Sequence, residues 1–160
     1  MRRRTRRASI ALTAGLGVAA LVVAGLAMGA RSESTVKVVL APRGDPTKLR
    51  PSTGVAKAGR VTFVVSNQSN IPHKSYGVPD AAEGHELVVL KTSLAPDKLR
   101  VNKKGDFAIE TGRVGKPLVL DPGKAGAITL NLKPGKYVLI CNLLGHYAAG
   151  QYAAFRVTAS

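Results

Sequence analysis

The sequence is poor in cysteine, in aromatic residues and in long amphipathic patterns. Cys141 is the only cysteine, so no intramolecular disulfide can form. Tryptophan is absent and aromatic residues make up only 4% of the chain, which leaves Val, Leu, Ala and Gly to build a core. Branched aliphatic residues with many glycines between them suit strands and turns, and no segment has a convincing helical period. These absences favour an all-β protein without disulfides.

Acidic residues are scarce as well, with 9 Asp and Glu against 24 Lys and Arg and a formal net charge of +15. Six of the basic residues precede Ser32, so the rest of the chain is less basic than this total suggests. A positive surface favours acidic partners, anionic lipids or nucleic acid. Four basic residues between Lys98 and Lys104 have only Phe107 near them for base stacking. We therefore expect a solvated basic face and no nucleic-acid binding.

The first thirty residues have the layout of an export signal or a membrane anchor. Five arginines precede residue 8, and an uncharged run follows from Ala8 to Ala30, long enough to span a bilayer. The triplet Ala27–Gly29 offers a small-x-small cleavage site. The arginines stay on the cytoplasmic side, so the rest is exported to the periplasm, the cell surface or the medium. Where cleavage does not occur, residues 8–30 are a membrane tether.

Short apolar or alternating segments, separated by turn residues, recur along the remaining chain. Residues 31–35 form a polar connector, and residues 36–160 suffice for one domain. We expect a short helical turn at Pro96–Leu99 and leave 105–117 unassigned. The expected strands cover residues 36–41, 60–67, 85–92, 117–120, 125–132, 136–142 and 152–159. Seven to eight short strands with close turns predict a Greek-key antiparallel β-sandwich.

One loop near the end of the chain gathers side chains that can bind a metal. A strand leads to Cys141, His146 follows five residues later, and Gln151 stands five residues further on. Thiolate, imidazole and a weaker glutamine oxygen are donors that copper uses when it cycles between two oxidation states. A second imidazole must come from His73 or His85. Taken alone, a buried inert thiol and a surface histidine would explain the first two residues equally well.

From Val36 to Val157 the sequence resembles the small cupredoxins, the blue-copper proteins of bacteria and archaea. The resemblance rests on AGRVTFVVSN, HELVVLKTSLAPDKL and YVLICNLLGHYAAGQYAAFRV. It implies a cupredoxin-like sandwich that holds one type 1 copper ion through Cys141 and His146. The family usually has methionine at the axial position, and Gln151 resembles the glutamine variant of the stellacyanin branch. An amide oxygen is a harder donor than a thioether, which favours Cu(II) and lowers the reduction potential.

The resemblance leaves two candidates for the upstream histidine ligand. His85-Glu86 matches the residues at and after the family's ligand, whereas His73 has the short spacing from Asn67. We choose His85, because the strand that follows would hold its imidazole rigidly, and keep His73 as the alternative.

The resemblance implies an electron carrier and not an enzyme. Copper oxidases resemble two or more such domains with extra histidines, and this chain has three histidines in all. We expect a monomer that meets redox partner proteins with acidic docking surfaces at an apolar collar of Tyr147, Leu143 and Leu144 around His146. The alternative function is copper binding or delivery without electron transfer. A metal-free structural sandwich would leave Cys141 unexplained.

Overall fold

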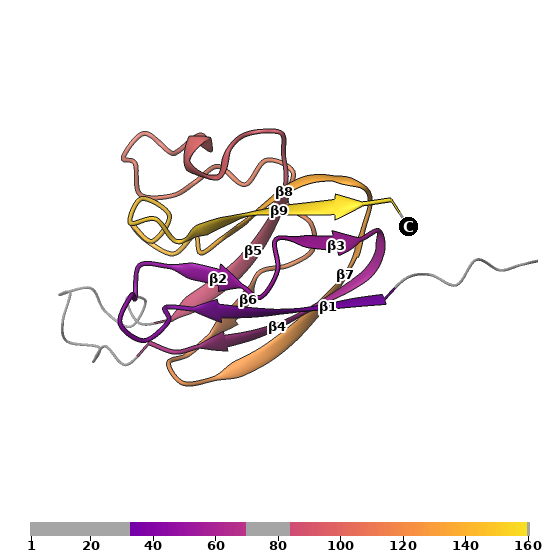
Figure 1. Ribbon diagram of the computed structural model, residues 1–160. Helices are drawn as coiled ribbons and strands as arrows, with labels where there is room; N and C mark the ends of the chain where they lie inside the picture. The colour runs from indigo at the N-terminus through magenta and orange to yellow at the C-terminus, as the bar shows by residue number, and fades with distance from the viewer. Residues whose placement is uncertain (1–32, 70–83, 160) are drawn as a thin grey trace, which may run out of the picture.

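The computed structural model describes residues 33–69 and 84–159, which form two β-sheets packed face to face (Figure 1). The proposed signal or anchor segment and His73 lie outside these residues. No helix within 33–69 and 84–159 is long and apolar enough to cross a membrane. The elements in chain order are β1 (Glu33–Leu40), β2 (Leu49–Pro51), β3 (Val55–Lys57), β4 (Gly59–Asn67), β5 (His85–Lys91), the 3-10 turn η1 (Pro96–Lys98), β6 (Leu118–Leu120), β7 (Ala125–Leu132), β8 (Gly135–Ile140) and β9 (Tyr152–Thr158).

The predicted all-β sandwich is confirmed, with two differences of detail. One sheet has the order β2-β1-β4-β7 and the other β3-β9-β8-β5-β6, which makes nine strands in the described part of the chain instead of seven or eight. The strands β2 and β3 have three residues each, too few to show a period in the sequence. The pairs β1–β4 and β3–β9 are parallel, so both sheets are mixed and not purely antiparallel. Parallel pairing of this kind has no local sequence signature.

The main core lies between the sheets and follows the alternation along the strands. In β4, Val61, Phe63 and Val65 are fully buried while the residues between them face outward. The Phe63 ring meets Phe155 of β9 edge to face, with ring centroids 5.4 Å apart. This contact joins the two sheets at the middle of the sandwich.

The segment 92–116, which we call the covering segment, lies over the outer face of the second sheet. It contributes Leu99 and Ala108 to a second apolar cluster with β5 and β8. Both faces of β5 are therefore buried, which explains its continuous apolar run. Gly112 fastens this segment to β5: its carbonyl accepts from the Lys91 N–H at 2.8 Å, its φ is +82°, and a Cβ there would overlap the Lys91 carbonyl oxygen. Only glycine fits that approach.

The two ends of the described chain lie at one end of the sandwich, and the loop between Cys141 and Gln151 lies at the other (Figure 1). The strand β1 runs from Glu33 toward the loop end, whereas β9 starts beside Gln151 and runs away from it.

Candidate metal centre

Strand pairing brings His85 and Cys141 together from distant parts of the chain. His85 is the first residue of β5, and Cys141 directly follows the last residue of β8. These strands are antiparallel neighbours, with Val88 opposite Ile140. The start of β5 and the end of β8 therefore lie side by side, which places the imidazole next to the thiol.

The loop after β8 folds back so that His146 returns to the same place. The His146 N–H donates to the Leu143 carbonyl at 2.9 Å, and the Gln151 N–H donates to the His146 carbonyl at 3.1 Å. The Cys141 N–H then donates to the Gln151 carbonyl at 3.0 Å. Gly150, with φ at +100°, makes the reversal that leads into β9. The loop is held by its own backbone hydrogen bonds.

Four side chains converge at this end of the sandwich. The Cys141 Sγ lies 3.2 Å from His146 Nδ1 and 3.7 Å from His85 Nδ1. One ligand atom from each of these three residues falls within 4.8 Å of the others. The Gln151 Oε1 accepts a hydrogen bond from His85 Nδ1 at 2.9 Å. The structure thus brings His85, Cys141, His146 and Gln151 together, as the sequence predicted for a ligand set.

Burial keeps the nitrogen and sulfur atoms of this cluster uncharged in the metal-free protein. Desolvation and the neighbouring His146 lower the pKa of His85 to about 4, and desolvation also lowers the pKa of His146. Desolvation raises the pKa of Cys141 to about 12, against backbone hydrogen bonds that act in the opposite direction. Near neutral pH both imidazoles are therefore free bases and the thiol keeps its proton. A metal ion that displaces this proton would bind a thiolate and two neutral imidazoles.

The sulfur of Cys141 also accepts a hydrogen bond from the Glu86 backbone N–H at 3.3 Å. The Glu86 side chain is buried and accepts from the Asn142 N–H at 3.2 Å. Desolvation, with the nearby Glu110 carboxyl, raises the pKa of Glu86. Glu86 and Asn142 directly follow His85 and Cys141 in the chain, and this placement of a carboxyl and an amide was the only signal in the sequence for these contacts.

Asn142 ties the covering segment to the metal-site loop. Its Oδ1 accepts from the Ala108 N–H at 2.7 Å, and its Nδ2 donates to the Ala108 carbonyl at 3.0 Å and to Glu110 Oε1 at 2.8 Å. Both polar groups of Ala108 are thus satisfied by one buried side chain. A movement of the covering segment would therefore displace Asn142, the residue that follows Cys141.

Asn67 performs a similar task on the other side of His85. It is 2% exposed, and its Nδ2 donates to the Leu120 carbonyl at 2.9 Å while its Oδ1 accepts from the Ser69 N–H at 2.9 Å. Leu120 is the residue paired with His85 across β5 and β6. Asn67 therefore links the end of β4 to the strand pair that carries His85.

Tyr147 does not belong to an exposed collar around His146, so that expectation was wrong. Its side chain is 5% exposed and packs in the second apolar cluster. Its hydroxyl accepts from the Leu99 N–H at 3.0 Å and donates to the Pro96 carbonyl at 2.9 Å. Tyrosine has an apolar ring and a polar tip, and here the tip is used inside the protein. Leu144 is 45% exposed, and His146 is half-buried.

Gln151 is buried, and both ends of its amide have partners. While Oε1 faces His85, Nε2 donates to the carbonyl of Pro46 in the β1–β2 loop at 2.6 Å. Pro46 was not among the residues that the sequence pointed to, because a backbone carbonyl has no signature in the sequence.

The donor set fits copper by its chemistry. Two imidazoles and a thiolate with a weak axial donor form the set that blue-copper sites use, whereas Mg²⁺ and Ca²⁺ require oxygen ligands. Within residues 33–69 and 84–159, no other group of three His, Cys, Asp or Glu residues is placed to hold a metal ion. The cluster of His85, Cys141 and His146 is therefore the candidate copper site.

No protein-family model matches the chain, and no curated protein gives a significant sequence match. Among solved structures, rusticyanin from Thiobacillus ferrooxidans is similar, with a TM-score of 0.58, 14% identity and 79% of each chain covered. A rusticyanin variant with one methionine replaced by glutamine has a TM-score of 0.56, 18% identity and the same coverage of both chains. A reduced auracyanin from the photosynthetic bacterium Roseiflexus castenholzii has a TM-score of 0.49 and 19% identity, covering 81% of this chain and 99% of that one. The similarity to rusticyanin shows that this chain has the cupredoxin fold.

Proposed function

We propose that this chain, which has the cupredoxin fold, holds one type 1 copper ion and serves as a one-electron carrier. The observation that carries the proposal is the convergence of His85, Cys141, His146 and Gln151 at one end of the sandwich. Bound copper would supply a couple between Cu(I) and Cu(II). We assign the two imidazoles and the thiolate as strong ligands and the Gln151 oxygen as the axial one.

The protein's own residues hold this ligand set in one arrangement. His85 and Cys141 are fixed by the pairing of β5 with β8, and the loop that carries His146 is closed by backbone hydrogen bonds. The Glu86 N–H points at the sulfur and would stabilise the negative charge of a thiolate. Ligands on paired strands move little, which suits a site that gains and loses an electron without rearrangement.

The path for the electron leads through His146, the one proposed strong ligand that is not fully buried. The segment 100–109, which we call the basic hairpin, lies against the loop that carries this residue. The basic hairpin is closed by the bridge between Val101 and Ala108, and the Gly145 N–H donates to the Asp106 carbonyl at 3.0 Å. A partner bound to the basic hairpin would therefore lie close to His146.

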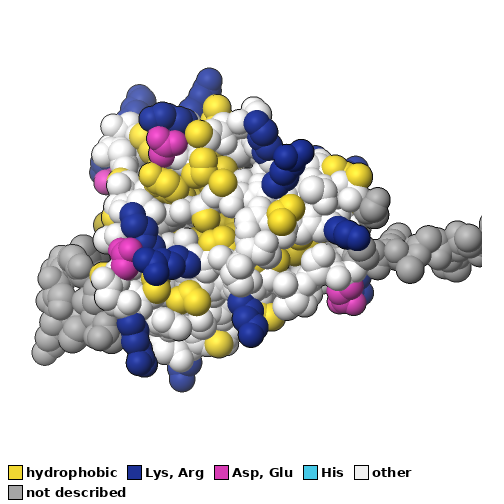
Figure 2. Space-filling model, viewed as in Figure 1, with side chains coloured by type: hydrophobic (Ala, Val, Ile, Leu, Met, Phe, Trp, Pro, Cys, Tyr) yellow, Lys and Arg dark blue, Asp and Glu magenta, His cyan; other side chains and the backbone are white. Residues whose placement is uncertain are grey.

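We propose that the partner is an acidic redox protein. The basic hairpin and the adjoining loop present four large exposed apolar side chains, which are Val101, Phe107, Ile109 and Leu144. The exposed cations of the basic hairpin are Arg100, Lys103 and Lys104, and none of them has an ion pair with the described residues. Figure 2 shows Lys and Arg scattered over the viewed face and few Asp or Glu. Basic groups around an apolar patch suit an acidic partner and fast association at low salt.

A comparison of two small oxidants tests this charge preference without the natural partner. Anionic ferricyanide should oxidise the reduced protein faster in the wild type than in a variant with Lys103→Glu and Lys104→Glu, whereas a cationic cobalt complex should show the opposite order. Equal rates in both proteins at low salt would contradict the docking surface.

The remaining expectations follow as part of the same proposal. The chain is not an enzyme, acts as a monomer, and works after export, in the periplasm or outside the cell, with residues 1–30 as signal or anchor, 31–35 as connector and 36–160 as the copper domain. An electron carrier in that location needs no second substrate site.

An absorption spectrum of the Cu(II)-loaded protein tests the function. We expect an intense visible band from thiolate-to-copper charge transfer and reversible redox cycling. The band should disappear in His85→Ala and persist in His73→Ala, which is the matched control. Loss in His73→Ala alone would reverse the ligand assignment. Stoichiometric copper without the band would favour copper delivery, and no copper uptake would refute the proposal.

A further inference from the structure

We propose that the backbone carbonyl of Pro46 is a positioning group that fixes Gln151 with its amide oxygen, and not its nitrogen, facing the metal site. This inference rests on the proposed copper function, because it explains how the axial donor is held. It assigns a role to the β1–β2 loop, residues 41–48, which contributes no ligand itself.

The orientation follows from what each atom can do in a hydrogen bond. A carbonyl oxygen only accepts, so the end of the amide that faces Pro46 must be the NH₂ group. The distance from Nε2 to the Pro46 oxygen is 2.6 Å. A flipped amide would bring two oxygens together at that distance. The Oε1 atom is therefore held on the side of His85, 2.9 Å from its Nδ1.

Burial makes this orientation strict. Gln151 is 3% exposed, so water cannot replace either partner of the amide. A methionine at this position would leave the Pro46 carbonyl without a donor, and a glutamate would place a carboxylate oxygen against it. The β1–β2 loop is thus matched to glutamine and determines which axial donor the site accepts.

The β1–β2 loop is built to hold the carbonyl in place. It begins at Ala41, whose φ of 47° is the only positive value among the described non-glycine residues. The Ala41 N–H donates to the Lys48 carbonyl at 3.0 Å and closes the loop at its base. Strained backbone of this kind persists only where the surroundings enforce it, and it concentrates at functional sites.

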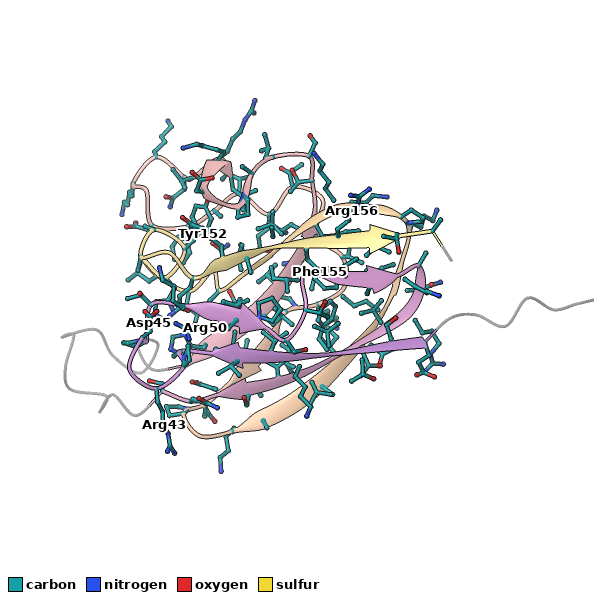
Figure 3. All side chains as sticks on the ribbon, in the orientation of Figure 1. Arg43, Asp45, Arg50, Tyr152, Phe155 and Arg156 are labelled. Carbon is teal, nitrogen blue, oxygen red and sulfur yellow. The ribbon has the colours of Figure 1, made fainter. Side chains whose placement is uncertain are left out.

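Asp45 fastens the tip of the loop. Its carboxylate accepts from Arg50 at 3.0 Å and from the Thr47 hydroxyl at 3.2 Å, and Asp45 and Thr47 flank Pro46 in the chain. Asp45 and Arg50 lie side by side at the end of the sandwich that carries the ligand loop (Figure 3). The loop also reaches Gly150, where an added Cβ would stand 3.8 Å from the Thr47 carbonyl oxygen. The loop and the step before Gln151 are therefore in contact.

The test follows the side-chain NH₂ of Gln151 by NMR in the full chain labelled with ¹⁵N-glutamine. The chain has only two glutamines, and the other, Gln68, is exposed and serves as an internal reference. Hydrogen exchange is measured in the metal-free and the Cu(I)-loaded protein. We expect the Gln151 NH₂ to exchange at least about tenfold more slowly than that of Gln68, since it is buried and donates to Pro46.

Two variants then separate the positioning role from general stability. Asp45→Ala should speed Gln151 NH₂ exchange at least about tenfold and should change the Cu(II) electron paramagnetic resonance spectrum, because the amide oxygen is no longer held. Glu33→Ala is the matched control: it also removes a surface ion pair, with Arg60, but at the far end of β1. Both signals should stay as in the wild type.

The outcomes distinguish this inference from the proposed function. Exchange at the rate of Gln68 in the wild type, or equal exchange in Asp45→Ala and Glu33→Ala, would overturn the positioning role even if the protein is an active blue-copper carrier. Protected exchange that is lost in Asp45→Ala supports the positioning role even if Cu(II) gives no visible band, in which case the proposed function alone fails.

Discussion

Tyr147→Phe is the substitution that best tests how the covering segment is held beside the metal site. The change removes one oxygen atom and leaves the buried ring in place. That oxygen accepts from the Leu99 N–H at 3.0 Å and donates to the Pro96 carbonyl at 2.9 Å. Both partners belong to the turn around η1, which has no other contact of this kind with the loop that carries His146 among the described residues. The hydroxyl therefore connects the turn to the loop through two hydrogen bonds.

The expected cost follows from the two hydrogen bonds. Each is worth about 1 kcal/mol net, and a buried N–H left without a partner costs about 1–3 kcal/mol. Leu99 is 9% exposed, so water can replace only part of what is lost. We expect the free energy of unfolding to fall by about 2 kcal/mol. For a domain of this size that corresponds to a fall in Tm of about 8 °C.

Urea unfolding of the metal-free protein measures this cost without a contribution from the metal. The midpoint should move to lower urea while the slope of the transition stays unchanged. Tyr152→Phe is the matched control, because that hydroxyl has no hydrogen-bond partner among residues 33–69 and 84–159, and its effect should stay within about 0.5 kcal/mol. An equally small effect of Tyr147→Phe would show that the two hydrogen bonds of this hydroxyl do not hold the turn to the loop.

Three further predictions follow from the contacts around the site. Gly112→Ala should lower the free energy of unfolding by more than about 3 kcal/mol in urea titrations, because φ is +82° and the new Cβ would overlap the Lys91 carbonyl; a loss below about 1 kcal/mol would contradict this close approach. Asn142→Ala should cost about 3 kcal/mol and speed amide exchange at Ala108, whose N–H and carbonyl both lose their partner; unchanged exchange there would show that the covering segment is held otherwise. Cu(II) binding at pH 7 should release about one proton into weakly buffered solution, because the pKa of Cys141 is raised to about 12 while the imidazoles are already neutral. The apparent affinity should accordingly rise with pH, and release of no proton would argue against a thiolate ligand.

The sequence predicted the strands that alternate and missed those that do not. Val61, Phe63 and Val65 mark β4 because every second residue enters the core. The strands β2 and β3 are too short to show a period, and they lie in a segment rich in proline and glycine. The segment 105–117 could not be assigned because it is held by long-range contacts, such as those between Ala108 and Asn142, which local patterns do not contain.

The candidate site was predictable where it lies on one loop. The spacing of Cys141, His146 and Gln151 pointed to a ligand set before any fold was known. His85 was preferred to His73 because of the strand that follows it, whereas its place beside Cys141 comes from the pairing of β5 with β8, which the sequence does not contain. Pro46 could not be predicted, because it contributes a backbone carbonyl that a residue of any type would also offer.

The placement of the chain ends determines how the molecule would present its metal site if it is anchored. The strand β1 begins at the end opposite the ligand loop, and its eight residues extend over roughly 26 Å. An anchor ahead of Glu33 would therefore join the sandwich at the end opposite the ligand loop. The length of the sandwich would then separate His146 from the lipid headgroups. A soluble electron carrier could then reach the exposed side of the site from the aqueous compartment. The tether would restrict diffusion of the protein but would not block electron transfer at His146.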